Sequence, residues 1–412
     1  MSTFTVSIED TQVDGNTIQF KLMGNEDYGL DKSIVNSLRR TLMSEIPSVA
    51  FRVEEGTNKD IVMDVNNTSL HNEFLLHRLS MIPIYLDPKE YKKQYLFYLN
   101  VKHDGSNPFK FVTTDDIQIF PLKNGFTPGD TVSMDDYDML QPLSKQERKE
   151  ILRSYTFRGK EYPILLTELK STNVEGNYQE LSWYGVPSVS DGRENAAWKA
   201  VSDATYVFLE NEELFMKVAQ DKAGHKKIID DQKREEFIEQ LRLAEAERYY
   251  YRDSNNEAYK YLMTVTAIHF NSSRELFIQA CNIMIDKLTT LKQHCINLVK
   301  GGPTTVSIQP TQNESNYIFT FVGQNDTIGN VLQSHIVNHY IDEQSFLGFC
   351  GYKKSHPLEE YVNLYVGINP TNEAFKQNEE FKLNAMVKFM DDVFEDLMGI
   401  YRDISKEALK SL

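Results

Sequence analysis

The chain has 412 residues, of which 41% are hydrophobic and 25% are charged, and its formal net charge at pH 7 is −16. This composition is typical of a globular protein with two or three domains, and its acidic balance opposes sequence-independent binding to nucleic-acid phosphates. It has no run of 18 apolar residues, no signal-peptide pattern and no CxxC pair among its three cysteines. We therefore expect an intracellular protein without membrane spans, disulfides, or zinc or iron–sulfur centres.

The first 83 residues predict a unit with the order β, β, α, β, α. Two alternating apolar runs, at 4–8 and 18–22, flank Asp14-Gly15, a turn pair typical of a β-hairpin. Residues 31–47 predict a helix that Asp31 caps and Pro47 ends. A strand-like region follows, then residues 66–69 as a loop and helix cap, and a short helix that ends near Pro83.

The helix at 31–47 has two unlike faces. Its apolar residues recur every four positions and predict a packed stripe, whereas Arg39 and Arg40 lie beside that stripe, where a core would desolvate them at high cost; the stripe consists of Ile34, Leu38, Leu42 and Ile46. By pattern alone, two solvated arginines on a core helix are the favoured interpretation. The alternative is that the arginines bind a partner outside this domain.

Residues 89 to about 205 predict a different, β-rich domain, because short β-prone runs alternate there with turns such as DGSNP and KNGFTPGD. From 221 to 256 the chain is highly charged, and its one apolar stripe consists of Ile238, Leu241 and Ala244. We interpret that segment as a largely solvated helix and linker, with disorder as the alternative.

The last third of the chain predicts a second unit with the plan of the first. A strand at 261–270 precedes a long helix near 272–299, and Gly301-Gly302-Pro303 breaks the chain. Strand-like runs at 304–309 and 316–322 then lead into a helix that begins near Asp326 or Thr327, a strand at 361–368 and a helix near 379–407. Both long helices carry apolar seams spaced by three and four residues, namely Phe277, Cys281, Met284, Leu288, Leu291, Cys295 and Leu298, and Leu383, Met386, Met390, Val393, Leu397, Ile400 and Ile404.

The two units also share a short sequence pattern. Setting SIVNSL at 33–38 against TIGNVL at 327–332 aligns Ile34, Asn36 and Leu38 with Ile328, Asn330 and Leu332. Two apolar seams in one chain suggest pairing within it. We expect two related halves, one of which carries an insertion.

These segments resemble a known family. NSLRRTLMSEIPSVAF at 36–51 and NNTSLHNEFLLHRLSMIPI at 66–84 resemble the larger α-like assembly subunit of multisubunit DNA-dependent RNA polymerases. NDTIGNVLQSHI at 325–336 and GYKKSHPLE at 351–359 resemble the smaller α-like subunit. Their presence in one chain is similar to the fused subunit of large DNA viruses of eukaryotes.

The resemblance implies an α+β fold in which two α-like dimerisation units, built of strands and long helices, pair within one chain around an inserted β-rich domain. Its parts are the larger unit at 1–88, the insert at 89–205, a charged helix or linker at 206–256, the second part of the larger unit with its long helix at 257–300, and the smaller unit at 301–412. The internal dimer seam is then expected to contain Ile34, Leu38, Leu42, Leu288, Leu291, Leu332, Met390, Val393 and Leu397.

In function, the resemblance implies a non-catalytic scaffold without cofactors that docks the two largest polymerase subunits, with a small accessory subunit as a further candidate partner. Residues on the family motifs are the expected partner-interface residues: Asn36, Arg39, Arg40, Glu73, His77, Arg78, Asn330, Tyr352 and His356. A viral origin implies host cytoplasm or virion as the location, with the nucleus left open.

The sequence departs from the family in three places. The insert has Asn195 and Ala200 where the family ordinarily has His and Pro, so contacts around them are expected to differ. It also lacks the cysteines that hold zinc or an iron–sulfur cluster in many larger subunits. Because the chain ends soon after its last helix, we expect neither the DNA-binding domain of bacterial α subunits nor direct promoter contact.

Two other classes of function remain as alternatives. His335 and His339 have the i, i+4 spacing of metal ligands, but no HExxH glutamate or third ligand accompanies them, so we favour histidines on a helix surface or interface over an autonomous metalloenzyme. An interaction protein that uses the two seams to form a homodimer is the other alternative. The short Gly-Gly-Pro link favours pairing within the chain.

Overall fold

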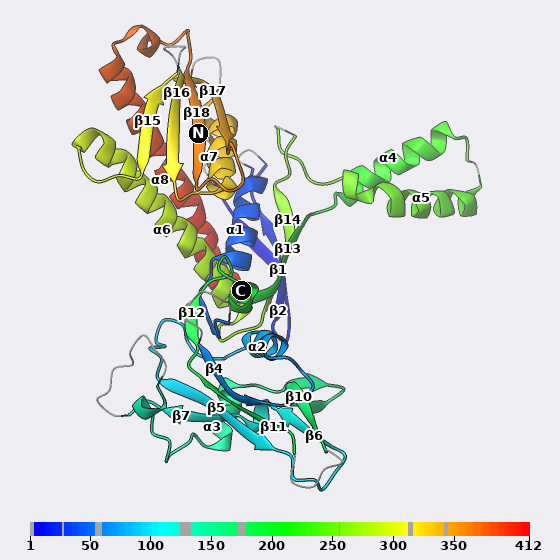
Figure 1. The fold of residues 1–412 in the computed structure, drawn as a ribbon. Helices are drawn as coiled ribbons and strands as arrows, with labels where there is room; N and C mark the ends of the chain where they lie inside the picture. The colour runs from blue at the N-terminus through cyan, green and yellow to red at the C-terminus, as the bar shows by residue number, and fades with distance from the viewer. Residues whose placement is uncertain are drawn as a thin grey trace. The chain divides into compact units, whose positions relative to one another are not determined.

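The computed structural model describes residues 4–26, 29–53, 60–123, 133–171, 178–228, 230–254, 256–311, 316–341 and 345–412 (Figure 1). The chain forms two compact units. The first contains Met1–Leu42, Asp203–Thr266 and Ser273–Leu412, and the second contains Met43–Ser202 and Ala267–Ser272. Both mix helices and strands, in agreement with the predicted α+β class.

The first unit contains a four-stranded antiparallel sheet in the order β1-β2-β14-β13. Its strands are β1 (Ser7–Asp14), β2 (Thr17–Met23), β13 (Val201–Phe208) and β14 (Lys260–Ala267). The predicted hairpin is confirmed, because Asp14 pairs with Thr17 around Gly15, whose φ is +57°. Tyr261 of β14 lies opposite Leu22 of β2, so distant segments of the chain build one sheet.

A second four-stranded antiparallel sheet in this unit has the order β15-β16-β18-β17. Its strands are β15 (Val306–Pro310), β16 (Asn316–Val322), β17 (Leu347–Lys353) and β18 (Tyr361–Ile368). In each sheet the first two strands form a hairpin, β1-β2 or β15-β16. The next position holds the later of the two remaining strands, β14 or β18, and the edge holds the earlier one, β13 or β17. The pattern analysis missed β17, because Gly348 and Gly351 interrupt its apolar alternation and its pairing is irregular near Phe349.

Four helices accompany these sheets: α1 (Lys32–Ser44), α6 (Ser273–Lys300), α7 (Asp326–Tyr340) and α8 (Glu379–Ser411). Asp31 Oδ1 accepts a hydrogen bond of 2.7 Å from Ser33 N, as predicted for a cap. Helix α7 contacts β17 and β18, whereas α6 and α8 lie side by side (Figure 1). Lys292 Nζ on α6 lies 3.1 Å from Asp391 Oδ1 on α8 and also pairs with Glu395. The predicted seam residues are buried except for Leu298 and Leu383, which lie at the outer ends of the two stripes and are half-buried.

The charged segment forms a pair of helices, α4 (Glu212–His225) and α5 (Asp231–Glu245). Phe215, Ala219 and Leu241 are buried between them and form a small core of their own. The sequence predicted one solvated helix and a linker. That prediction missed α4, and of its apolar stripe Leu241 is buried, Ile238 is half-buried and Ala244 is exposed.

In its described residues, the second unit contains short strands, two helices and 3-10 turns. One antiparallel sheet has the order β4-β11-β5-β7, and three two-stranded sheets pair β10 with β6, β12 with β3 and β8 with β9. The strands are β3 (Ser48–Ala50), β4 (Ile61–Asn66), β5 (Tyr95–Lys102), β6 (Phe109–Thr113), β7 (Gln118–Pro121), β8 (Tyr155–Phe157), β9 (Lys160–Tyr162), β10 (Leu165–Lys170), β11 (Glu180–Gly185) and β12 (Ser188–Ser190). The helices are α2 (Asn72–Ser80) and α3 (Lys145–Ile151); the 3-10 turns among the described residues of both units are η1 (Thr114–Asp116), η2 (Met134–Asp136), η3 (Ala196–Trp198), η4 (Ala246–Arg248) and η5 (Glu373–Lys376).

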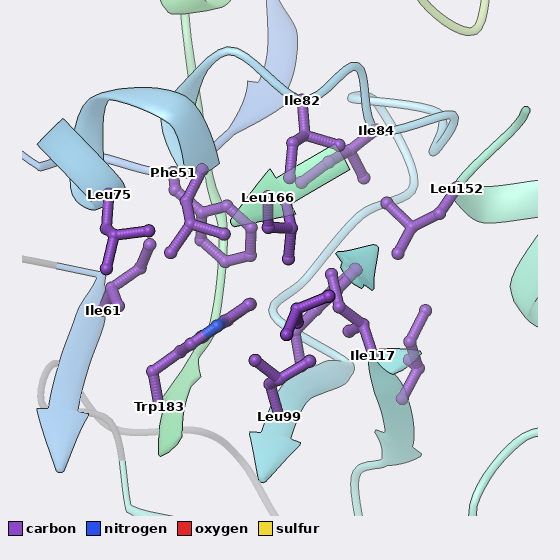
Figure 2. Packing of buried hydrophobic residues seen from close by; sticks show 14 of the residues in the cluster. Phe51, Ile61, Leu75, Ile82, Ile84, Leu99, Ile117, Leu152, Leu166 and Trp183 are labelled. Atoms are coloured by element: carbon purple, nitrogen blue, oxygen red, sulfur yellow. The ribbon is translucent and has the colours of Figure 1, made fainter. Parts of the chain in front are cut away.

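A large apolar core holds the second unit together, and Figure 2 shows part of it. Trp183 and Phe97 lie with their rings edge-on to Phe51, at centroid distances of 6.0 and 5.4 Å. Leu75 reaches this core from α2, so one face of α2 packs on it. Aromatic pairs of this geometry stabilise a core beyond the area that they bury.

Pairing between strands shows why the predicted boundaries differ from the units. Strand β4 lies within the predicted range 1–88, but it pairs with β11 and thereby belongs to the sheet of the second unit. The predicted end of the insert at 205 cuts β13, which belongs to the first sheet of the first unit. Of residues 66–69, Asn66 ends β4 and 67–69 form a loop, and none of them caps α2, since the N-cap position is His71, without a side-chain cap.

The two departures from the family pattern lie around η3. Asn195 Oδ1 accepts a hydrogen bond of 2.9 Å from Ala197 N and so caps this turn. Trp198 is buried and donates from Nε1 to Ser188 O, while Ala200 is also buried. An asparagine cap and a small buried alanine therefore fit this segment locally.

Candidate functional site

The two arginines on α1 have different partners. Arg39 is half-buried, and its Nε donates a hydrogen bond of 2.9 Å to Asn36 Oδ1 on the same helix. Arg40 is exposed, and its Nε donates a hydrogen bond of 2.7 Å to Thr327 Oγ1 at the start of α7. Arg40 therefore joins the two helices on which the repeated sequence pattern lies.

A second polar contact joins the same helices. Asn338 Nδ2 near the end of α7 lies 3.2 Å from Asp31 Oδ2, which precedes α1. Ser37 of α1 is also hydrogen bonded to Tyr401 of α8 in the buried interior. Helix α1 is thus held by polar contacts to both helices of the second repeat.

Beside Arg40 lies a polar pocket of about 110 Å³ between α1 and α7. It brings together four of the predicted interface residues, Asn36, Arg40, Asn330 and Tyr352, although they are up to 316 positions apart in the chain. Ser33, Asp326 and Thr327 complete the lining. The sequence analysis did not select these three, although Ser33 and Thr327 occupy equivalent positions in the aligned segments and could have been found there.

Tyr352 forms one wall of this pocket because a glycine lets it approach α7. A Cβ built on Gly329 would lie 2.7 Å from Tyr352 Cδ2 and 2.8 Å from Val362 Cγ1. Tyr352 N also donates to Gln333 Oε1 at 2.9 Å. Burial raises the pKa of the Tyr352 hydroxyl, Asp326 raises it further and Arg40 lowers it, so these two charges act on the same wall in opposite directions.

Other predicted interface residues lie on α2 in the second unit. His77 and Arg78 line an apolar pocket of about 480 Å³, together with Leu70, Phe74, Met81, Ile82, Ile164 and Leu165. Phe74 and Met81 are 66% and 60% exposed. Glu73 is exposed on the same helix but does not line the pocket. Phe74 on α2 and Met81, the C-cap residue that follows it, were not among the predicted interface residues, although both line this pocket.

His356 lies apart from both pockets. It is exposed in the loop between β17 and β18, where its Nδ1 accepts a hydrogen bond of 3.2 Å from Leu358 N. The predicted interface residues therefore fall in three places: in or near the polar pocket, on α2 in or near its apolar pocket, and in this loop.

The prediction that His335 lies on a helix surface is wrong, whereas its alternative, a position at an interface, stays a prediction. Its side chain is fully buried, and neither ring nitrogen has a hydrogen-bond partner among the described residues. Burial lowers the pKa of His335 to about 3, with a further lowering from His339, whose ring centroid lies 4.8 Å away. Within the described ranges, no three His, Cys, Asp or Glu side chains are grouped so that they could hold a metal ion.

The three cysteines are free and buried, two on α6 and one on β17. Burial raises the pKa of Cys295 and Cys350 to about 12, so both thiols are protonated at neutral pH and act as small apolar groups. No helix in the part of the chain that the structure describes is long and apolar enough to cross a membrane.

A comparison with known proteins identifies the family to which this chain belongs. The family model described as RNA polymerase Rpb3/Rpb11 dimerisation domain matches residues 28–288. Two relatives are the DNA-directed RNA polymerases I and III subunit rpac1 of Dictyostelium discoideum, 40% identical over 99 residues, and RPAC1 of Homo sapiens, 37% identical over 90 residues. A third is the DNA-directed RNA polymerase subunit Rpo3 of Pyrobaculum calidifontis, 44% identical over 57 residues.

These matches to individual relatives are partial. They cover 24%, 21% and 14% of this chain, and 23%, 22% and 19% of the relatives. The family match is broader, since it runs from before α1 into α6 and includes both candidate arginines and the whole of α2. The chain belongs to the RNA polymerase Rpb3/Rpb11 dimerisation domain family.

Proposed function

We propose that this chain is a non-catalytic assembly platform of a multisubunit DNA-directed RNA polymerase. In this proposal its two repeats form an intramolecular pseudo-heterodimer that docks the two largest, catalytic subunits. The observation that carries the proposal is the family match over residues 28–288, which includes the helix with Arg39 and Arg40. The partners, the subunit fusion and a viral origin with work in the host cytoplasm or virion are parts of the proposal.

The equal strand order of the two sheets in the first unit supports the pseudo-heterodimer. Their orders are β1-β2-β14-β13 and β15-β16-β18-β17, each with one shorter helix after its hairpin and one long helix after its last strand. The long helices α6 and α8 pack on each other, with Leu288, Leu291, Met390, Val393 and Leu397 buried. A seam that is filled within one chain leaves little apolar surface for the alternative, a homodimer through the same helices.

The chemistry of Arg40 supports a docking role on α1. A guanidinium group keeps its charge, is weakly hydrated and presents several donors in a plane, so it suits interfaces between proteins. In this chain the Nε of Arg40 is engaged by Thr327, which holds the side chain beside the polar pocket. A side chain that is already held loses less conformational entropy when a partner binds.

The decisive experiment is a charge reversal of both arginines. The Arg39→Glu/Arg40→Glu chain is expected to remain folded by circular dichroism but to lose co-precipitation of the second-largest polymerase subunit. A matched control is Lys406→Glu/Lys410→Glu on α8, which makes the same change in net charge at side chains that are 68% and 72% exposed. Undiminished recovery of that subunit by the arginine variant would refute the docking role.

A further inference from the structure

Near the start of α1, a buried hydroxyl group lacks a hydrogen-bond partner among the described residues. Ser33, the second residue of α1, is 3% exposed and lines the polar pocket. Its backbone N donates to Asp31 Oδ1, but its Oγ has no hydrogen-bond partner among the described residues. Leaving a buried hydroxyl unpaired costs about 1–3 kcal/mol, so the position favours any ligand that supplies the missing hydrogen bond.

The second repeat shows what is missing in the first. Thr327 occupies the position equivalent to Ser33, and its Oγ1 accepts the hydrogen bond from Arg40 Nε. The position equivalent to Arg40 is Ser334, whose side chain is too short to reach across to Ser33 in the same way. The two repeats are therefore asymmetric, and one of two matching hydroxyl groups lacks the partner that the other has.

The remaining lining of the pocket indicates the class of ligand. Asn36 Oδ1 is occupied by Arg39 Nε, so the other end of that amide, Nδ2, is a donor. Ser33 and Asn330 add a hydroxyl and an amide, and Arg40 adds a positive charge. These groups favour a ligand that accepts hydrogen bonds and carries negative charge.

Asp326 limits how much negative charge the pocket tolerates. It is exposed and belongs to the same lining, where its charge opposes that of Arg40. A ligand with a single negative charge fits this balance better than a phosphate group, which carries about −1.5 to −2 at pH 7. A pocket of about 110 Å³ has room for the end of one side chain.

We propose that the polar pocket between α1 and α7 binds the carboxylate of one Asp or Glu side chain from the polymerase subunit that docks on α1. Ser33 Oγ and Asn36 Nδ2 donate hydrogen bonds to this carboxylate, and Arg40 supplies the opposite charge. This inference rests on the proposed function, since it names the partner chemistry of the same surface.

The first test separates binding from folding. Because a hydrogen bond to a charged group is lost, Ser33→Ala is expected to weaken docking of the second-largest subunit by about tenfold or more. The thermal midpoint of the free chain is expected to stay equal or rise, because the unpaired hydroxyl is gone. The matched control Ser334→Ala changes the equivalent of Arg40 and should leave the affinity unchanged.

The second test identifies the carboxylate directly. An Asn330→Lys chain that still docks is treated with a carbodiimide, which joins an amine to a carboxylate in contact with it, and the products are analysed by mass spectrometry. We expect one peptide of the docked subunit that contains an Asp or Glu to be joined to the amine introduced by Asn330→Lys. Changing that acidic residue to Lys in the partner should then restore docking to the Arg40→Glu chain.

The results of these tests separate a failure of the carboxylate proposal from a failure of the proposed assembly function. If charge reversal of Arg39 and Arg40 leaves docking intact, the proposed function fails, and the pocket proposal fails with it. If charge reversal abolishes docking but Ser33→Ala binds with unchanged affinity and no crosslink forms, the pocket holds only water. That result would overturn the carboxylate proposal and leave the platform standing.

Discussion

The hydroxyl groups of Ser37 on α1 and Tyr401 on α8 lie 2.6 Å apart in the buried interior of the first unit. Ser37 Oγ also donates to Ile34 O at 2.6 Å, so the proton of the shared bond comes from Tyr401. This bond links the helix that carries the candidate docking arginines to the long helix of the second repeat. Burial raises the pKa of the Tyr401 hydroxyl far above its ordinary value, which keeps it a donor.

Removing the Tyr401 hydroxyl is expected to cost stability and little else. Tyr401→Phe keeps the ring and its packing but leaves the Ser37 oxygen without its donor. We expect the free energy of unfolding to fall by about 1–2 kcal/mol, measured by urea denaturation. Tyr365→Phe, at a half-buried tyrosine of β18, is a suitable comparison. Equal stability of Tyr401→Phe and the wild type would show that the shared bond contributes nothing net.

A buried charge in the α6 seam is expected to lower the free energy of unfolding far more than Tyr401→Phe does. Leu291 is 2% exposed on the face of α6 that packs on α8, so Leu291→Asp places an unpaired carboxylate there. The expected loss is about 4 kcal/mol or more, seen as a collapse of the thermal midpoint. Asn282→Asp adds the same charge on the exposed face of α6 and should behave as wild type. A wild-type midpoint for Leu291→Asp would argue against a packed seam.

Gly329 offers a test in which the usual rule is expected to reverse. In a helix interior, replacing Gly by Ala normally stabilises a protein by about 1 kcal/mol. Here the added Cβ would lie 2.7 Å from the Tyr352 ring, so Gly329→Ala is expected to destabilise the first unit and to move Tyr352 in the polar pocket. Gly399→Ala on α8, where nothing lies within 4 Å of the new Cβ, should stabilise instead. A stabilised Gly329→Ala chain would contradict the close packing.

The lowered pKa of His335 makes the free energy of unfolding depend on pH. Its folded-state pKa of about 3 lies below the ordinary value of 6.5, so the unfolded chain binds the extra proton between those values. The stabilising contribution of the neutral ring is complete above pH 6.5 and is lost as the pH falls toward 3, by up to about 1.4 kcal/mol per pH unit. Chemical denaturation at several pH values measures this slope.

Replacing the ring by an apolar side chain should flatten that dependence. His335→Leu removes both unpaired nitrogen atoms, so we expect unchanged or higher stability at pH 7 and a shallower decline below pH 6.5. The control His225→Leu, at an exposed position of α4, should retain the wild-type slope. An identical slope in His335→Leu would mean that another group controls the acid response.

Local patterns predicted the helices and the first hairpin well, because their signals lie close together in the sequence. The spacing of Ile34, Leu38 and Leu42 was enough for α1, and Gly15 was enough for the turn. The pairing of β4 with β11 and the link from Arg40 to Thr327 could not be predicted in this way, since the partners lie more than 100 residues apart. Motif resemblance selected Asn36, Asn330 and Tyr352, but only the fold shows that they share one pocket.

Burial of polar side chains was the hardest property to predict. The i, i+4 spacing of His335 and His339 indicated one helix face but not whether that face is wet, and His335 proved to be buried. Likewise, Ser33 carries no signal in its own sequence that its hydroxyl lacks a partner. Both facts follow from the packing of helices that are far apart in the chain.

The most direct test of the platform is the set of proteins that accompany this chain. It would be purified under gentle conditions from its natural source, at its natural abundance, and the bound proteins would be identified and counted by mass spectrometry. We expect the two largest RNA polymerase subunits in a one-to-one ratio with the chain. A stable homodimer that contains no other polymerase subunit would contradict the account.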